Sequence, residues 1–268
     1  LKGRQKLFFL HLGTAASCCK AYSDPLSSFD NIKQLTDSWD QQRQLLQHGH
    51  EIPSCNFCWQ RESQGQQSYR HLKVNEAVNQ IELYLDNTCN QMCGYCSPKF
   101  SSTWENSITK HGMFQNVSQD ANENLKVIPV AVDTQYWLDQ VHQYIQQQPD
   151  NTVYLKLLGG EPLMQIKHLE KLLSFNSRKI RQLRINTNPP NNKFLLWLLE
   201  NVPANQMFFD VSLDAVPEFN HVPRAGFDQQ QFLENLKLLK QHQVRYKFLS
   251  VVSVLNIFDL SRFLAWGK

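Results

Sequence analysis

The sequence predicts an α/β fold in which parallel β-strands alternate with α-helices. Three observations support this prediction. From residue 80 onward, short segments that alternate apolar and polar residues are separated by segments with helical periodicity. Some strand segments stop at glycine or proline pairs, as at Gly159-Gly160 and Pro189-Pro190. Helices of this length between strands are typical of βαβ units, which form a parallel sheet through right-handed crossovers.

The expected elements follow one another in a regular order. Strand patterning is found at residues 80–86, 152–158, 179–186, 207–214 and 246–255. Helical patterning is found at residues 135–148, 166–174, 193–201 and 229–242, and a further helical stretch begins at residue 259. Residues 1–79 lack this alternation and contain helical patches around 31–48 with turn signals at Gly49 and Pro53. We therefore place a boundary near residue 75, with an N-terminal module at 1–75 and the α/β core at 76–268.

Composition excludes several classes of protein. The chain has 268 residues, of which 41% are hydrophobic and 11% aromatic, so it can build a core and is not wholly disordered. The formal net charge of +3 is small and scattered, and we expect no nucleic-acid partner. No stretch reaches the ~18–20 apolar residues of a membrane span, and we expect no membrane partner. The apolar run Leu7–Leu10 is too short for an export signal, which favours a cytoplasmic location.

Seven cysteines form three tight groups within the first 96 residues. The third group is Cys89-x3-Cys93-x2-Cys96, which follows the first predicted strand. Three thiolates in one loop suit three irons of a cubane cluster and leave the fourth iron open, whereas electron-transfer cubanes take four cysteine ligands. A structural zinc site or reduced cysteines are the alternatives. Zinc needs a fourth ligand, and the nearest histidine, His111, lies well outside the loop.

Four motifs stand in order at the ends of predicted strands. They are the cysteine loop with Tyr95 before its last cysteine, Gly159-Gly160-Glu161-Pro162, Asn186-Thr187-Asn188 and Ser212-Leu213-Asp214. Together they resemble the motifs of the radical S-adenosylmethionine (radical SAM) superfamily over residues 80–258. Ligands of parallel sheets bind beyond the carboxyl ends of the strands, where all four motifs are expected.

The resemblance implies a fold and a set of binding residues. The superfamily's partial (β/α) barrel normally has six strands, and only five are predicted after residue 79. We therefore expect a barrel that lacks its sixth strand, in a chain truncated at its C-terminus, with an exposed apolar edge at 246–255 that promotes aggregation. Cys89, Cys93 and Cys96 are expected to hold a [4Fe–4S] cluster. The residues expected to contact S-adenosylmethionine are Tyr95, near its adenine, and Gly159, Gly160, Glu161, Asn186, Ser212 and Asp214.

The remaining cysteines are Cys18, Cys19, Cys55 and Cys58. Their segment resembles the twitch and SPASM modules of radical SAM proteins, which carry an auxiliary iron–sulfur cluster. A Cys-x2-Cys pair with a distant cysteine pair is also typical of a zinc ribbon. Side chains of adjacent residues point different ways on an extended chain, which weighs against one metal binding both Cys18 and Cys19. An auxiliary cluster, zinc and no metal are therefore all retained.

For function, the resemblance implies a radical enzyme. A reduced cluster would cleave S-adenosylmethionine to methionine and a 5′-deoxyadenosyl radical, which abstracts hydrogen from a substrate. Analogy with the family suggests a peptide substrate and a reductant such as a flavodoxin or ferredoxin. The alternative is a non-enzymatic iron–sulfur, zinc-binding or electron-transfer protein on the same scaffold. Cleavage of S-adenosylmethionine by the reduced protein discriminates between the two.

Overall fold

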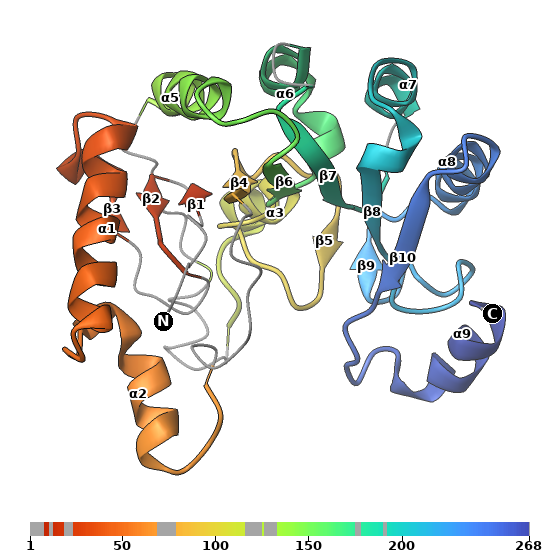
Figure 1. Ribbon diagram of the computed structural model, residues 1–268. Helices are drawn as coiled ribbons and strands as arrows, with labels where there is room; N and C mark the ends of the chain where they lie inside the picture. The colour runs from red at the N-terminus through yellow and green to blue at the C-terminus, as the bar shows by residue number, and fades with distance from the viewer. Residues whose placement is uncertain are drawn as a thin grey trace. The chain divides into compact units, whose positions relative to one another are not determined.

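The computed structural model describes residues 8–10, 13–18, 24–68, 79–115, 125, 133–174, 178–189 and 192–267 (Figure 1). The chain divides into two compact units. The first comprises Leu1–Tyr84, Val130–Lys156 and Leu172–Gln182, and the second comprises Leu85–Pro129, Leu157–Lys171 and Leu183–Lys268. The predicted boundary near residue 75 lies outside the described residues and stays a prediction.

The central element is a parallel sheet with the strand order β1-β4-β6-β7-β8-β10. Its pairs β1–β4, β7–β8 and β8–β10 are parallel. The order is linear, with β1 and β10 at its two ends, so the described residues form an open sheet rather than a closed barrel. This confirms the predicted α/β fold with a partial barrel. The strands are β1 (Phe8–Leu10), β4 (Asn79–Tyr84), β6 (Val153–Leu158), β7 (Ile180–Thr187), β8 (Met207–Ser212) and β10 (Arg245–Leu249).

Two predictions about the strands need correction. The sheet has six strands rather than five, because β1 comes from the segment assigned to the N-terminal module and pairs with β4. The fifth predicted strand, at 246–255, is also too long, because β10 ends at Leu249. The residues after it form a turn closed by Asn256, whose Oδ1 accepts a hydrogen bond from the Ser253 backbone N–H at 2.7 Å.

The first unit contains the helices α1 (Ile32–Gln47), α2 (Asn56–Ser63) and α5 (Thr134–Gln146). The side chain of Asn31 caps α1 and that of Asp133 caps α5, each by accepting a backbone N–H of the first turn. Apolar residues at helical spacing, among them Trp39 and Val141, are buried, as is typical of helices that cover a core. The short elements of this unit are β2 (Thr14–Ala15), β3 (Asp24–Pro25) and the 3₁₀ helices η1 (Leu26–Ser28) and η2 (Pro53–Cys55).

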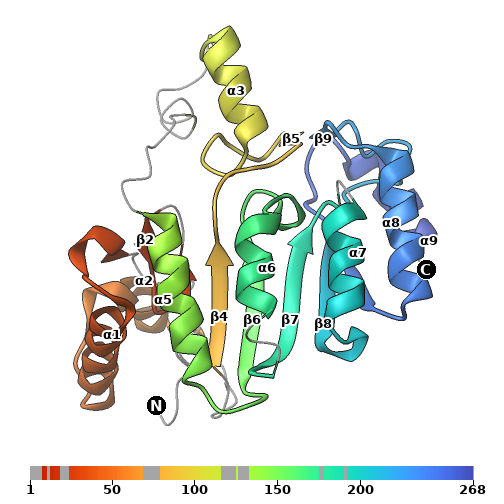
Figure 2. The same cartoon turned by 90° about the horizontal axis from the view of Figure 1, so that it is seen from above.

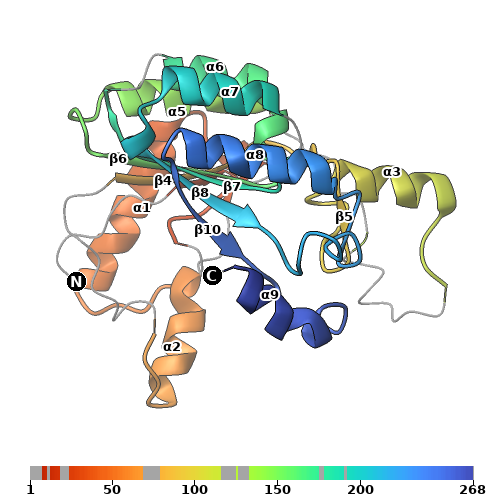
Figure 3. The same ribbon diagram turned by 90° about the vertical axis from the view of Figure 1, so that its right-hand side faces the viewer.

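The second unit contains the helices that follow the later strands. They are α3 (Ser102–His111), α7 (Asn192–Asn201), α8 (Gln229–Gln241) and α9 (Leu260–Trp266), together with most of α6 (Ile166–Ser174). Figure 3 shows α7 and α8 on one face of β7, β8 and β10, and α9 on the other side. The Phe248 ring of β10 packs against Trp266 of α9 with centroids 5.5 Å apart. The short elements are β5 (Met92–Cys93), β9 (Arg224–Ala225), η4 (Pro162–Met164), η5 (Ala204–Gln206) and η6 (Ile257–Asp259).

None of the helices in the described ranges combines the length and the apolar character that crossing a bilayer requires.

Candidate functional site

The cysteine loop lies in the second unit, at the carboxyl end of its strands. Within the loop, β5 pairs antiparallel with β9, so that Cys93 faces Arg224 in the ladder. Figure 2 shows this two-stranded ribbon beyond the arrowhead of β7. The position agrees with the rule that ligands of parallel sheets bind beyond the carboxyl ends of the strands.

The first turn of α3 fixes the loop through side-chain hydrogen bonds. Thr103 Oγ1 donates to the Cys89 carbonyl oxygen at 2.7 Å, and Trp104 Nε1 donates to that of Cys93 at 2.9 Å. Ser101 caps the helix by accepting from the Trp104 backbone N–H at 3.2 Å. The first turn of α3 therefore holds the backbone of the first two cysteines in place.

The three thiols of the loop are close enough to influence one another. Cys89 and Cys93 are buried, and Cys96 is half-buried. Burial, together with the charges of Glu161 and Cys93, raises the pKa of Cys89 to about 11. Burial and the charge of Cys96 raise the pKa of Cys93, and burial and the charge of Cys89 raise that of Cys96. Thiolates are therefore disfavoured here unless a cation accompanies them.

Three thiols supply the donors of the cysteine loop. In the part of the chain that the structure describes, no three His, Cys, Asp or Glu side chains are grouped so as to hold a single metal ion. A zinc ion needs such convergence, because all its ligands bind one atom. A cubane cluster does not, because each thiolate binds a different iron. The three thiols of the loop thus offer one thiolate to each of three irons.

Gly160 brings the turn after β6 against the backbone that precedes Cys89. Its φ is +51°, in the left-handed region that favours glycine. A Cβ on Gly160 would lie 2.5 Å from the Thr88 carbonyl oxygen and 2.9 Å from that of Asp86. The next residue, Glu161, donates its backbone N–H to the Thr88 carbonyl oxygen at 2.7 Å. The turn after β6 thus packs closely against the backbone of the cysteine loop.

The Glu161 carboxylate joins the ends of β6 and β7. It is buried and accepts hydrogen bonds from Leu163 N at 3.0 Å, Thr187 Oγ1 at 2.5 Å and Asn188 N at 2.7 Å. Burial raises the pKa of Glu161 to about 7, although these three hydrogen bonds favour the charged form. The carboxylate therefore links the ends of these two strands by hydrogen bonds.

Several side-chain amides of the second unit have a buried atom without a hydrogen-bond partner in the described part of the chain. The oxygens of Asn186 and Asn188 at the end of β7 are of this kind, as is Oε1 of Gln165. Asn188 Nδ2 lies 3.8 Å from Cys89 Sγ. An unpaired buried acceptor costs about 1–3 kcal/mol, so such atoms mark places where a ligand can supply the missing donor.

Asp214 stands at the centre of a saturated hydrogen-bond network. Its Oδ2 accepts from Tyr95 Oη at 2.6 Å and from Arg224 Nε at 2.7 Å, and its Oδ1 accepts from Val251 N at 2.8 Å. Burial, together with the charge and hydrogen bond of Asp214, raises the pKa of Tyr95, a residue that is 41% exposed. Burial alone would lower the pKa of Arg224, but the charge of Asp214 raises it overall. Ser212 is half-buried at the end of β8.

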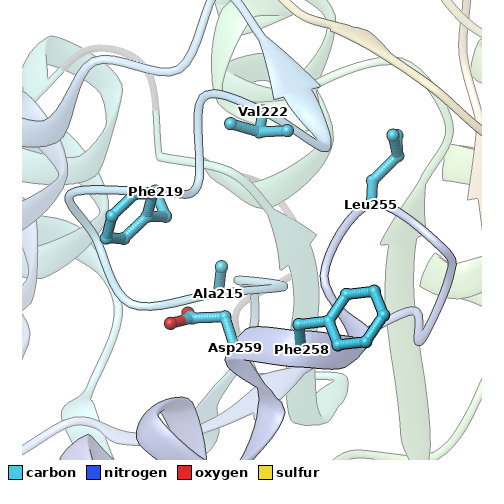
Figure 4. A pocket seen from close by; sticks show the side chains of 6 residues that line it. All are labelled: Ala215, Phe219, Val222, Leu255, Phe258 and Asp259. Carbon is cyan, nitrogen blue, oxygen red and sulfur yellow. The ribbon is translucent and has the colours of Figure 1, made fainter.

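A pocket of about 260 Å³ lies in the second unit beside this network. Figure 4 shows its lining, which consists of Ala215, Phe219, Val222, Leu255, Phe258 and Asp259. Phe258 is 96% exposed, so the apolar wall is open to solvent. Leu255 also reaches the cysteine loop, because a Cβ on Gly94 would lie 2.9 Å from Leu255 Cδ1. The pocket therefore borders the loop.

The N-terminal cysteines belong to the first unit. Cys18 and Cys55 are half-buried, and Cys58 is buried in α2. Cys19 lies outside the described residues. Within the described residues, Cys18, Cys55 and Cys58 do not belong to a group of side chains that could hold a metal ion. A metal site in this unit stays a prediction.

Two features of the site were missed by sequence reasoning. Arg224 carries no motif and stands in a two-residue strand, which is too short for a periodic pattern. Helix α3 did carry a signal: Ser101 at its N-cap, Lys110 and His111 in its last turn, and Gly112 after it.

Comparisons with known proteins complete the description of the site. A family model described as "Radical SAM superfamily" matches residues 84–260. No curated protein matches the chain. Among solved structures, "Native anSMEcpe with bound AdoMet and Kp18Cys peptide" is 17% identical with a TM-score of 0.47, covering 70% of this chain and 48% of that one. Streptococcus suis SuiB bound to precursor peptide SuiA is 17% identical with a TM-score of 0.44, covering 70% and 37%. The chain thus spans less than half the length of these solved structures.

Proposed function

Since this chain belongs to the radical SAM superfamily, we propose that it is an enzyme in which Cys89, Cys93 and Cys96 hold a [4Fe–4S] cluster. One observation carries the proposal: the three thiols share a loop that Gly160 and Glu161 hold at the ends of the strands. This loop offers three ligands of the kind that iron–sulfur clusters take. A fourth iron is then left for a ligand that the protein does not supply.

The surrounding residues fit a cluster with S-adenosylmethionine beside it. The raised pKa values of the thiols disfavour the thiolate form. Cationic irons compensate the negative charge and so allow the thiols to ionise. The unpartnered oxygens of Asn186 and Asn188 can accept from the amine and hydroxyl groups of S-adenosylmethionine. When bound, the reduced cluster would supply the electron for reductive cleavage of S-adenosylmethionine, and hydrogen abstraction from a substrate would depend on that cleavage.

The chain's own residues bind, orient and exclude water. We assign the half-exposed ring of Tyr95 to the adenine, with its hydroxyl held by Asp214. Gly159 and Gly160 form the turn that lets S-adenosylmethionine approach the backbone beside the loop. Glu161, Ser212 and Asp214 complete the proposed site, with the two carboxylates holding the turn and the loop in place.

We propose a peptide substrate whose apolar part meets the pocket walled by Phe219 and Leu255. The pocket borders the cysteine loop, and the radical must form within contact of the bond it attacks. A flavodoxin or ferredoxin is proposed as reductant. Deuterated peptides test the substrate class, since transfer of deuterium into 5′-deoxyadenosine identifies a hydrogen donor. Phe219→Ala should reduce this transfer without changing the iron content.

The central test uses the full chain reconstituted anaerobically with iron and sulfide. We expect a cubane signal in electron paramagnetic resonance after reduction, and 5′-deoxyadenosine when S-adenosylmethionine is added. The triple variant of Cys89, Cys93 and Cys96 to alanine should lose one cubane cluster, with its share of the iron, and all formation of 5′-deoxyadenosine. Gly65→Ala is the control, because it changes a residue of the other unit, leaves every cysteine in place and brings no heavy atom within 4 Å of the new Cβ, so it should keep cleavage. A reduced, cluster-loaded protein that leaves S-adenosylmethionine intact would favour the non-enzymatic alternative.

The same preparation addresses the N-terminal cysteines. We propose that Cys18, Cys19, Cys55 and Cys58 hold an auxiliary cluster, on the resemblance of their segment to twitch and SPASM modules. The double variant Cys55→Ala/Cys58→Ala should then lose one cluster's share of iron and sulfide. Unchanged iron with stoichiometric zinc in the unreconstituted protein would show a zinc site instead.

A further inference from the structure

Arg224 is held against the sulfur of Cys93. The β5–β9 ladder sets Cys93 and Arg224 opposite each other, and Arg224 Nη1 lies 3.7 Å from Cys93 Sγ. The backbone on both sides is also fixed, because Gly94 N donates to the Pro223 carbonyl oxygen at 2.9 Å and Arg224 N donates to that of Asn220 at 3.1 Å. The guanidinium is therefore placed by the ladder and by its flanking turns.

The guanidinium has little freedom to leave this sulfur. Arg224 is only 7% exposed, and Asp214, which is 0% exposed, accepts from its Nε at 2.7 Å and from its Nη2 at 3.3 Å. This forked pairing uses two of the three guanidinium nitrogens and points the third at Cys93. Asp214 is itself held by Tyr95 and by the backbone N–H of Val251.

We propose that Arg224 is a positioning residue that donates an N–H···S hydrogen bond to the Cys93 thiolate and thereby raises the reduction potential of the cluster. The inference rests on the proposed function, because it requires a cluster on Cys93. Hydrogen bonds to cluster sulfurs and the net charge around them are among the factors that set cluster potentials. Reduction adds a negative charge to the cluster, and a donor with a positive charge at one ligand stabilises the reduced state more than the oxidised state.

The negative charge of Asp214 opposes the effect of Arg224 on the reduction potential. The two residues must therefore be replaced together. Removing Arg224 alone leaves a buried carboxylate without its counter-ion, which destabilises the fold and adds a negative field at the same time. The double variant Arg224→Gln/Asp214→Asn removes both charges and keeps groups of similar size. Arg224→Lys keeps a positive charge but lacks the planar fork that reaches the carboxylate and the sulfur together.

The experiment is a redox titration of the reconstituted full chain, followed by electron paramagnetic resonance, with iron content measured on each sample. We expect Arg224→Gln/Asp214→Asn to retain its iron but to shift the ratio of oxidised to reduced cluster at least tenfold toward the oxidised form. This shift equals about 59 mV for a one-electron couple. Arg224→Lys should shift the ratio by less, as a partial rescue.

A second arginine–aspartate pair provides the matched control. Arg184 Nε and Nη2 pair with Asp210 at 2.5 and 2.8 Å, and both residues stand within strands of the sheet, β7 and β8, rather than in the cysteine loop or β9. Arg184→Gln/Asp210→Asn should leave the potential unchanged. An unchanged potential in the iron-loaded Arg224→Gln/Asp214→Asn variant overturns the inference while leaving the proposed function intact. Failure of the wild-type chain to assemble any cluster overturns the proposed function first.

Discussion

Replacing Gly160 with alanine tests whether the turn after β6 must approach the cysteine loop so closely. The new Cβ would lie 2.5 Å from the Thr88 carbonyl oxygen, a separation that real Cβ atoms essentially never show. The backbone must therefore move, and overpacking of this kind typically costs ~1–3 kcal/mol. The φ of +51° adds the left-handed strain of an L residue, roughly 1–2 kcal/mol. The expected loss of unfolding free energy is about 2–5 kcal/mol.

Gly65→Ala separates the two contributions. Gly65 has a φ of +71°, and no heavy atom lies within 4 Å of the position that its new Cβ would take. This control should lose only the strain of roughly 1–2 kcal/mol. Urea unfolding followed by circular dichroism measures both variants under one linear extrapolation. Reconstitution adds an independent readout: Gly160→Ala should bind less iron, because the displaced residues 86–88 lead directly into Cys89, whereas Gly65→Ala should bind as much as wild type.

Two results would refute this reasoning. Equal losses of unfolding free energy in Gly160→Ala and Gly65→Ala would mean that the close contact with Thr88 adds no free-energy cost beyond the left-handed strain. A destabilised Gly160→Ala variant with full iron content would mean that the turn and the cysteine loop are not coupled.

Three further predictions concern single side chains. Glu161→Gln should flatten the pH dependence of the melting temperature of the cluster-free chain. Burial raises the folded-state pKa of Glu161 from 4.5 to about 7, so its contribution to stability is fully present below pH 4.5 and is lost as the pH rises through 7; an unaltered profile between pH 4 and 8 would contradict this. Val254→Ser should reduce self-association in sedimentation experiments and change stability by less than ~0.5 kcal/mol, because Val254 is 85% exposed. Asn186→Leu should weaken binding of S-adenosylmethionine to the reconstituted chain by about tenfold in equilibrium dialysis, from the loss of one acceptor; unchanged affinity would remove Asn186 from the proposed site.

The strands could be predicted from sequence because each has a periodic apolar pattern and a sharp stop. The segments expected at 152–158 and 179–186 correspond to β6 at 153–158 and β7 at 180–187. In both strands, buried residues alternate with half-buried or exposed residues along most of the length, so the residue pattern and the structure obey the same constraint. The helices predicted at 166–174 and 229–242 match α6 and α8 for the same reason.

The fifth strand was overextended because side-chain hydrogen bonds override β-propensity there. Val251, Val252, Val254 and Leu255 are residues that favour strands. Yet the backbone N–H of Val251 donates to the Asp214 carboxylate, and the Val251 carbonyl oxygen accepts from Asn256 Nδ2. These two backbone groups therefore bond to side chains rather than to a neighbouring strand. The apolar side chains of this turn remain exposed. No local pattern could reveal this, because Asp214 lies far away in the sequence.

The hydrogen-bond state of the candidate site residues divides them into two kinds. Glu161 and Asp214 are buried carboxylates whose oxygens already accept hydrogen bonds from the protein. A ligand that displaced one of these donors would have to replace the hydrogen bond that was lost. Asn186 and Asn188 instead have buried oxygens without a partner in the described residues, a cost that a ligand donor would relieve. The sequence motifs mark both kinds alike, because each follows a strand end. We therefore propose that the carboxylates hold the cysteine loop in place and that the amides bind S-adenosylmethionine.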